Sequence, residues 1–144
     1  MSAQRVSLVT LGVAEVPRSR AFYEAWGWRV RQENDDIVFF QCNGLVLALF
    51  RADLLADDQW RTREQLGVGG MTLAQNYPSV EDVDERYRAA VSAGATVLKP
   101  PEATNWGGYS GYVADPDGHV WEIAHNPYWD VSDDGSVVIP DSLP

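Results

Sequence analysis

The chain of 144 residues is 45% hydrophobic and 22% charged, which suits one globular domain and excludes a disordered or collagen-like chain. Its formal net charge of −10 argues against nucleic acid as a partner, because an acidic surface repels phosphate backbones. The single cysteine, Cys42, excludes a disulfide scaffold and suits a reducing compartment. The longest apolar run, residues 45–50, is too short for a membrane span, which needs ~20 residues. We therefore expect a cytoplasmic protein without nucleic-acid or membrane partners.

The first half of the chain predicts a strand, a helix and three further strands. Residues 6–13 are apolar on both faces and rich in β-branched side chains, which is typical of a central strand. Pro17 suits the first position of the following helix, Gly27 ends that helix, and a short strand at residues 28–31 comes next. The apolar stripe of this helix consists of Phe22, Ala25 and Trp26.

A hairpin completes this first half. Its strands, at residues 37–41 and 45–50, flank Asn43 and Gly44, a pair that predicts a type I′ turn with a positive φ at both positions. Residues 51–68 are charged and tolerant of helix, and we interpret them as a connector rather than a part of the core.

The second half predicts the same order of elements. After a strand at residues 71–77, Ser79 can cap a helix with Asp82 three residues further on, and Gly94 ends this helix. Its apolar residues recur with the helical period. They are Val80, Val83, Tyr87, Ala90 and Val91.

Three more strands complete the second half. We expect a short strand at residues 95–98, stopped by Pro100 and Pro101, and a hairpin of strands at residues 109–115 and 119–125. The repeated strand-helix-strand-strand-strand order indicates an internal duplication.

Two segments resemble a known family. Residues 13–23 (VAEVPRSRAFY) and 114–122 (ADPDGHVWE) resemble the signature segments of the glyoxalase/bleomycin resistance/extradiol dioxygenase superfamily, also called the vicinal oxygen chelate superfamily. The resemblance covers roughly residues 5–126. It implies an α+β fold in which two tandem βαβββ modules form a curled mixed sheet around a cavity. It also favours a homodimer, because two-fold pairing commonly covers exposed sheet edges. The expected single domain, residues 1–144, divides into modules at about 5–50 and 69–126, a linker at 51–68 and a tail at 127–144.

Metal-using members of this superfamily take ligands from the first and last strand of each module. Carried over by position, these sites are Leu8, Ala48, Met71 and Glu122, of which only Glu122 can bind a metal ion. His119 and His125 cannot complete the set without a bulge, because side chains alternate along a strand and both histidines point away from Glu122. We therefore expect no metal and no cofactor, and structural roles for both histidines.

Glu122 has two interpretations. It is either a cavity carboxylate that binds a ligand or acts as a base, or a family relic held by a neighbouring Tyr, Trp or water. Tyr112 matches the tyrosine of the extradiol dioxygenase motif, which lines the active site there together with the glutamate. A three-residue turn would pair Tyr112 with Glu122 on one face, whereas a two-residue turn would point Tyr112 outward. The Asp-Pro-Asp-Gly sequence of the turn favours the longer form.

The loop before this hairpin, residues 105–111, interleaves glycines with aromatic residues. Trp106 on this loop can stack on a planar ligand at the cavity, or it can cover the sheet edge. Strand alternation adds further candidates to Trp106, Tyr112 and Glu122. These further ligand-binding residues are Thr10, Phe39, Gln41 and Ser110.

Three functions agree with these residues. The first, which we favour because the lining is apolar and aromatic with few polar groups, is a glyoxalase/bleomycin-resistance-like protein. It would bind a small, planar or cationic organic molecule in a metal-free cavity. The second is a lyase, isomerase or dioxygenase that depends on a metal or uses Glu122 and Tyr112 as acid and base. The third is an association protein with a vestigial pocket. Whether any reaction is catalysed stays open at this point.

Overall fold

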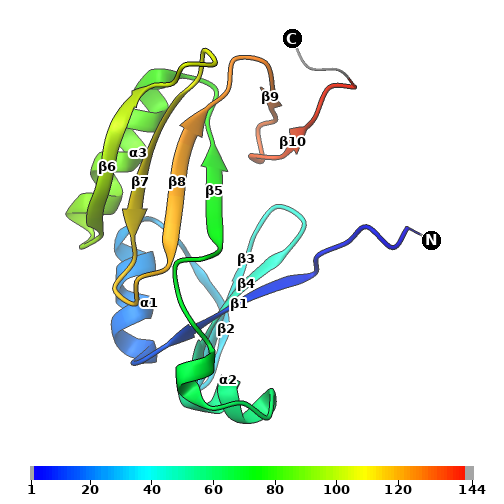
Figure 1. Ribbon diagram of the computed structural model, residues 1–144, viewed down its shortest axis with the longest axis vertical. Helices are drawn as coiled ribbons and strands as arrows, with labels where there is room; N and C mark the ends of the chain where they lie inside the picture. The colour runs from blue at the N-terminus through cyan, green and yellow to red at the C-terminus, as the bar shows by residue number, and fades with distance from the viewer. Residues whose placement is uncertain (1, 142–144) are drawn as a thin grey trace. The chain divides into compact units, whose positions relative to one another are not determined.

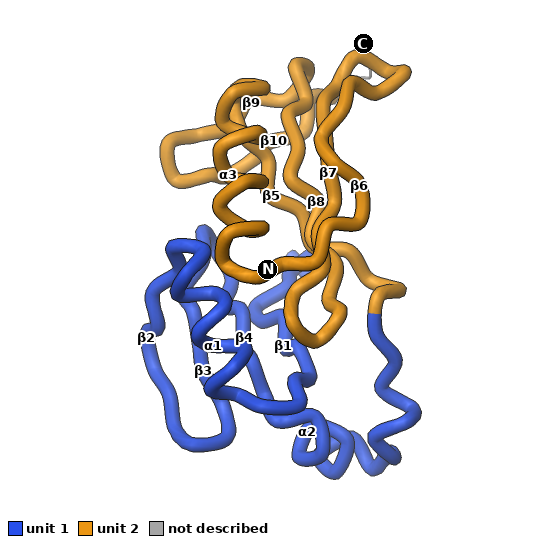
Figure 2. Tube along the Cα trace, turned by 90° about the vertical axis from the view of Figure 1, so that its left-hand side faces the viewer, with its two compact units in different colours: residues 1–68 blue, residues 69–144 orange. Residues whose placement is uncertain are grey.

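The computed structural model describes residues 2–141 and has two compact units, residues 1–68 and 69–144 (Figure 2). Each unit contains one strand-helix-strand-strand-strand module, as the sequence predicts (Figure 1). The fold is therefore mixed α+β, with one four-stranded mixed sheet in each unit. No helix within residues 2–141 is long and apolar enough to cross a membrane.

The sheet of the first unit has the strand order β1-β4-β3-β2. Its strands are β1 (Leu8–Val13), β2 (Val30–Glu33), β3 (Ile37–Gln41) and β4 (Val46–Arg51). β1 runs parallel to β4, and the other neighbours are antiparallel. Helix α1 (Val16–Ala25) packs on β3 and β4.

An aromatic cluster forms the core beneath α1. The rings of Tyr23, Trp28 and Phe40 have centroids 5.5 to 5.8 Å apart. The predicted stripe was wrong for Ala25, which is exposed, because the face that α1 buries runs through Phe22, Tyr23 and Trp26. The short strand β2 begins two residues later than predicted, since Trp28 belongs to this core.

The predicted turn between β3 and β4 was also wrong. Within residues 2–141, Trp60 is the only residue other than glycine with a positive φ, so Asn43 does not adopt the type I′ conformation. Gly44 alone, with a φ of 104°, makes the reversal.

The connector contributes to the core, which contradicts our interpretation of residues 51–68. It forms α2 (Ala52–Asp58) and the short 3₁₀ helix η1 (Arg63–Gln65). Ala52 and Ala56 are buried one helical turn apart, and α2 packs on β1 and β4. Small side chains at this spacing let the helix approach the sheet closely.

The sheet of the second unit has the strand order β5-β8-β7-β6, and α3 lies behind it in Figure 1. Its strands are β5 (Thr72–Asn76), β6 (Thr96–Ala103), β7 (Tyr109–Ala114) and β8 (Val120–His125). Helix α3 (Val80–Ser92) begins as predicted, because the Ser79 hydroxyl accepts a 3.1 Å hydrogen bond from the Asp82 N–H. It buries Val83, Tyr87 and Ala90 against the sheet. A small hairpin of β9 (Asp130–Val131) and β10 (Val137–Val138) follows.

Strand β6 differs from its prediction, because it continues through Pro100 and Pro101 instead of stopping there. Proline lacks the N–H group that an inner strand must donate, but β6 is an edge strand with only one neighbour. Its pairing with β7 shifts register on both sides of Lys99.

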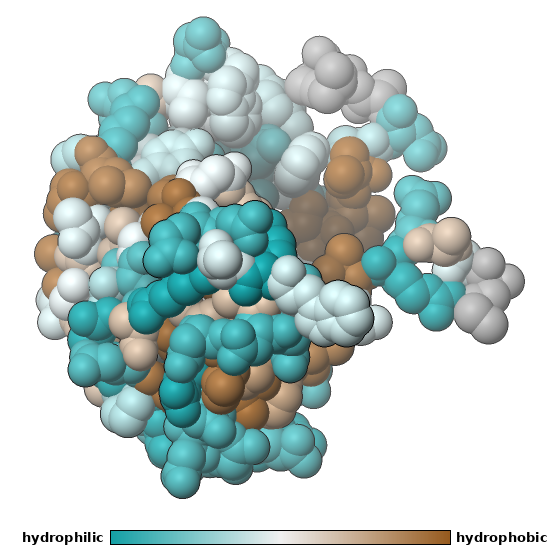
Figure 3. Space-filling view, turned by 60° about the horizontal axis from the view of Figure 1, so that its bottom comes forward, coloured by the Kyte–Doolittle hydropathy of each residue, from teal (hydrophilic) through white to brown (hydrophobic). Residues whose placement is uncertain are grey.

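Much of the surface is hydrophilic. Hydrophilic side chains predominate on the central part of the face that Figure 3 shows, with hydrophobic side chains scattered among them. Among the large hydrophobic residues within residues 2–141, Trp60 is the most exposed, at 96%.

Candidate functional site

A three-residue turn sets the register of the β7–β8 hairpin. The buried Asp115 carboxylate accepts hydrogen bonds from the backbone N–H groups of Asp117 and His119, both at 2.9 Å. Gly118 supplies the positive φ, 90°, that this turn requires. This is the longer turn that the sequence favours, and it pairs Tyr112 directly with Glu122.

Tyr112 and Glu122 form a hydrogen-bonded pair. The phenol donates to Glu122 Oε2 at 3.1 Å. Within residues 2–141, no second hydrogen bond reaches this carboxylate, so Oε1 remains able to accept one from a ligand. Burial raises the pKa of Tyr112, and the negative charge of Glu122 and the hydrogen bond to it raise this pKa further. The phenol therefore stays protonated at neutral pH and remains a donor.

Small side chains surround this pair on the sheet face opposite to α3, which we call the Glu122 face. Ala74 pairs with Glu122 from β5, and Ser110 pairs with Ala124 beside it. The larger side chains of β8, those of Trp121 and Ile123, are buried on the α3 side. The side chains that flank the carboxylate on this face are therefore small, and the large ones lie on the α3 side.

The loop that carries Trp106 is closed by hydrogen bonds at Thr104. The Thr104 N–H donates to the Gly108 oxygen at 2.9 Å, and the Gly108 N–H donates to Thr104 Oγ1 at 2.8 Å. The indole of Trp106 lies directly on Gly108, where an added Cβ would be 2.1 Å from the ring. Gly108 precedes Ser110 and Tyr112 at the spacing of alternate strand residues, so the half-exposed indole lies at the end of the Glu122 face.

The predicted residues of the first half share one face of the first sheet. Thr10 and Phe39 both pair with Ala48, and Gln41 pairs with Val46 on the same face. The Gln41 amide donates to the Cys42 oxygen at 3.1 Å and so serves its own hairpin. The cavity expected to join these residues to Tyr112 and Glu122 stays a prediction.

The two modules differ in chemistry at corresponding positions. The row Thr10–Ala48–Phe39 in the first sheet corresponds to Ala74–Glu122–Tyr112 in the second. A carboxylate and a phenol in the second module thus replace a methyl group and a phenyl ring in the first.

The first-strand positions of both modules need a correction. Met71 lies one residue before β5, and Ala74 is the residue that faces Glu122. In the first module Thr10, and not Leu8, faces Ala48. In the part of the chain that the structure describes, no three His, Cys, Asp or Glu side chains gather as a metal site would require. β8 pairs without a register shift, so His125 is on the opposite face from Glu122, with its Nδ1 3.0 Å from the Tyr77 oxygen.

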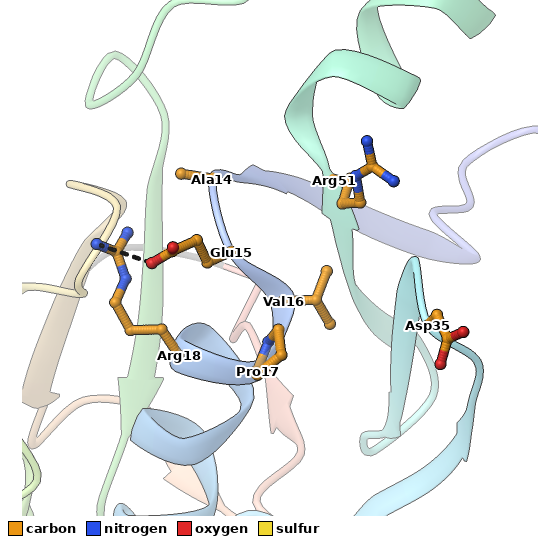
Figure 4. A pocket seen from close by; sticks show the side chains of 7 residues that line it. All are labelled: Ala14, Glu15, Val16, Pro17, Arg18, Asp35 and Arg51. Carbon is orange, nitrogen blue, oxygen red and sulfur yellow. Dashed lines mark ion pairs between the residues drawn. The ribbon is translucent and has the colours of Figure 1, made fainter.

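A separate pocket of about 410 Å³ lies in the first unit at the start of α1 (Figure 4). It is lined by Ala14, Glu15, Val16, Pro17, Arg18, Asp35 and Arg51. Arg18 lies 3.9 Å from Glu15, and Arg51 pairs with Asp36 and Asp53 outside the pocket. No sequence motif marks this pocket, because its lining comes from three separate segments of the chain.

The fold and these motifs agree with comparisons to known proteins. The model of the Glyoxalase/Bleomycin resistance protein/Dioxygenase superfamily matches residues 5–123. The chain belongs to this superfamily. A crystal structure of a glyoxalase-related enzyme from Fulvimarina pelagi is 40% identical with a TM-score of 0.88, covering 94% of this chain and 98% of that one.

More distant superfamily structures share the fold. Lactoylglutathione lyase from Agrobacterium tumefaciens is 20% identical with a TM-score of 0.68, covering 90% of this chain and 98% of that one. Among curated proteins, an uncharacterized protein of Mycobacterium tuberculosis (strain ATCC 25618 / H37Rv) is 47% identical over 45 residues, or 31% of this chain. The match spans only 26% of that protein's length.

Proposed function

We propose that this superfamily member binds a small planar organic molecule with a cationic or hydrogen-bond-donating group at the Glu122 face. The observation that carries the proposal is the 3.1 Å hydrogen bond from Tyr112 to Glu122, which orients the carboxylate and leaves Oε1 to accept from a ligand. A partly buried carboxylate with one hydrogen-bond partner is stabilised further when a ligand brings a second donor to it.

Trp106 supports a planar ligand rather than a flexible one. Its indole is 47% exposed and rests on Gly108, in a loop that hydrogen bonds at Thr104 hold in place. A fixed, half-exposed aromatic ring offers a stacking surface at little entropic cost.

We propose that the cavity works without a metal ion. At the superfamily's ligand positions carried over to this chain, Leu8 and Ala48 have no donor atom. The residues that pair with Ala48 and Glu122 from the first strands are Thr10, which offers only a neutral hydroxyl, and Ala74, which has no donor atom. One carboxylate does not supply the three or four ligands that a divalent ion needs.

A second candidate is a metal-free enzyme of the same superfamily. The Fulvimarina pelagi protein, 40% identical to this chain, is described as a glyoxalase-related enzyme. Glu122 would be the base, and the protonated Tyr112 phenol would donate to a developing negative charge on the substrate.

The binding proposal is tested with two probes of equal size, the cationic p-amidinobenzamide and the neutral terephthalamide. We expect the cation to bind more tightly, on the order of tenfold, because its amidinium donates a charge-assisted hydrogen bond to Glu122, whereas terephthalamide can donate only a neutral amide N–H. Glu122→Gln should abolish this preference. Glu85→Gln, which removes the same charge from an exposed position on α3, is the matched control. Equal affinity of both probes for the unmodified protein would overturn the proposal.

A further inference from the structure

Lys99, the only lysine of the chain, lies at a β-bulge in the edge strand β6. Val97 pairs with Val113, but Lys99, two residues later, pairs with Tyr112, which is only one residue away from Val113. Val113 is buried beneath α3, whereas Tyr112 lies on the Glu122 face. Because side chains alternate along a strand, the extra residue moves Lys99 onto the Glu122 face.

Two contacts hold this bulge in place. The Tyr87 hydroxyl, reaching from α3, shares its single proton between the Lys99 backbone oxygen at 3.2 Å and that of Tyr112 at 3.1 Å. Gly111 lets β7 approach so closely that a Cβ there would lie 2.7 Å from the Pro101 nitrogen and 2.9 Å from the Lys99 oxygen. The direction of Lys99 is therefore fixed by the fold, and bulges of this kind commonly aim a side chain beside a functional site.

The bulge completes a row of three functional groups on neighbouring strands. Lys99 on β6 contributes an ammonium, Tyr112 on β7 a phenol and Glu122 on β8 a carboxylate. Neighbouring strands are ~4.8 Å apart, so the two charged residues are anchored roughly 10 Å apart. This separation suits one aromatic ring that carries a polar group at each end.

Lys99 has a partner that a ligand can displace. Its Nζ lies 2.9 Å from Glu102 Oε1, and both side chains are more than half exposed. An exposed ion pair contributes little free energy to stability. The anionic group of a ligand that also makes stacking and hydrogen-bonding contacts can therefore replace Glu102.

We propose that Lys99 binds an anionic group of the ligand, which makes the ligand a planar zwitterion with its anionic end at Lys99 and its donor end at Glu122. The inference rests on the proposed function for the Glu122 end and adds the Lys99 end. A carboxylate or a sulfonate would satisfy it.

The test adds two probes of the same size, the anionic p-carbamoylbenzoate and the zwitterionic p-amidinobenzoate. We expect the zwitterion to bind about three- to fivefold more tightly than cationic p-amidinobenzamide at low salt, since Lys99 is exposed. Lys99→Met should remove this gain, and Glu102→Gln should increase it by freeing the ammonium. Arg88→Met, which removes a positive charge from an exposed position on α3, should preserve it.

The four probes separate this inference from the proposed function. Preference for p-carbamoylbenzoate over terephthalamide depends on Lys99 alone, and preference for p-amidinobenzamide over terephthalamide depends on Glu122 alone. If p-amidinobenzamide binds no more tightly than terephthalamide while p-carbamoylbenzoate still does, the proposed function is overturned and the anion site at Lys99 is kept. An anionic group that adds no affinity, or a Lys99→Met effect equal for all four probes, would overturn the inference. Failure of all four to bind would overturn both.

Discussion

Tyr112 and Glu122 face each other across the β7–β8 hairpin, joined by a 3.1 Å hydrogen bond from the phenol to Glu122 Oε2. The pairing results from the turn that precedes β8, because a turn shorter by one residue would move Tyr112 to the other face. The site therefore depends on a turn outside it, which the Asp115 carboxylate and the positive φ of Gly118 hold in shape.

Asp115→Ala should destabilise the protein by about 1–3 kcal/mol, because two backbone N–H groups lose the buried carboxylate that accepts from them. Urea unfolding measures this change. Asp133→Ala, at an exposed residue in the turn between β9 and β10, should have little effect. Similar small losses in both variants would show that Asp115 does not hold the turn.

Glu122→Gln should lower the pKa of Tyr112. Burial raises that pKa in either protein, but the variant lacks the negative charge that disfavours a tyrosinate beside it. Lys99→Met should raise the same pKa, because the ammonium favours the ionised phenol. NMR titration of labelled tyrosine, assigned with Tyr112→Phe, measures both shifts. Shifts of the opposite sign would contradict the row of groups on the Glu122 face.

Gly108→Ala should displace the Trp106 indole, because the new methyl group would lie within 2.1 Å of the outer edge of that ring. The side chain can rotate away, so we expect the affinity for planar probes to fall while stability changes little. The loss should be about two- to tenfold, the contribution of one aromatic stacking contact. Gly70→Ala, where an added Cβ meets nothing within 4 Å, is the control. Unchanged affinity would exclude Trp106 from the site.

Gly111→Ala should destabilise the protein by about 1–3 kcal/mol, because its Cβ would collide with the backbone of β6 and not with a movable side chain. Thermal unfolding compared with Gly70→Ala measures the effect. A neutral Gly111→Ala would show that the Lys99 bulge is loosely held.

Two features that depend on neighbouring residues were predictable from the sequence, although the equally local turn at Asn43 and Gly44 was not. The Ser79 cap and the Asp115–Gly118 turn form through hydrogen bonds between residues close in the chain, and both are confirmed. The pairing of Tyr112 with Glu122 follows directly from that turn, so this part of the candidate site could be predicted from the sequence.

Features that depend on distant contacts were not predictable in this way. Pro100 stops an inner strand, but the position of β6 at a sheet edge is a property of the whole sheet. The role of Ala74 depends on the parallel pairing of β5 with β8. The bulge at Lys99 depends on Tyr87 from α3 and on Gly111 from β7, neither of which is near it in the sequence.

The binding of p-amidinobenzamide to Glu122→Gln, compared with the unmodified protein and Glu85→Gln, tests the central claim most directly. Because Glu122 offers a charged carboxylate oxygen to the amidinium, we expect the dissociation constant of p-amidinobenzamide to rise on the order of tenfold in Glu122→Gln alone. That of terephthalamide should change much less, because its neutral amide can also donate to the glutamine side-chain oxygen. Equal dissociation constants in all three proteins would contradict the assignment of Glu122 as the ligand-binding carboxylate.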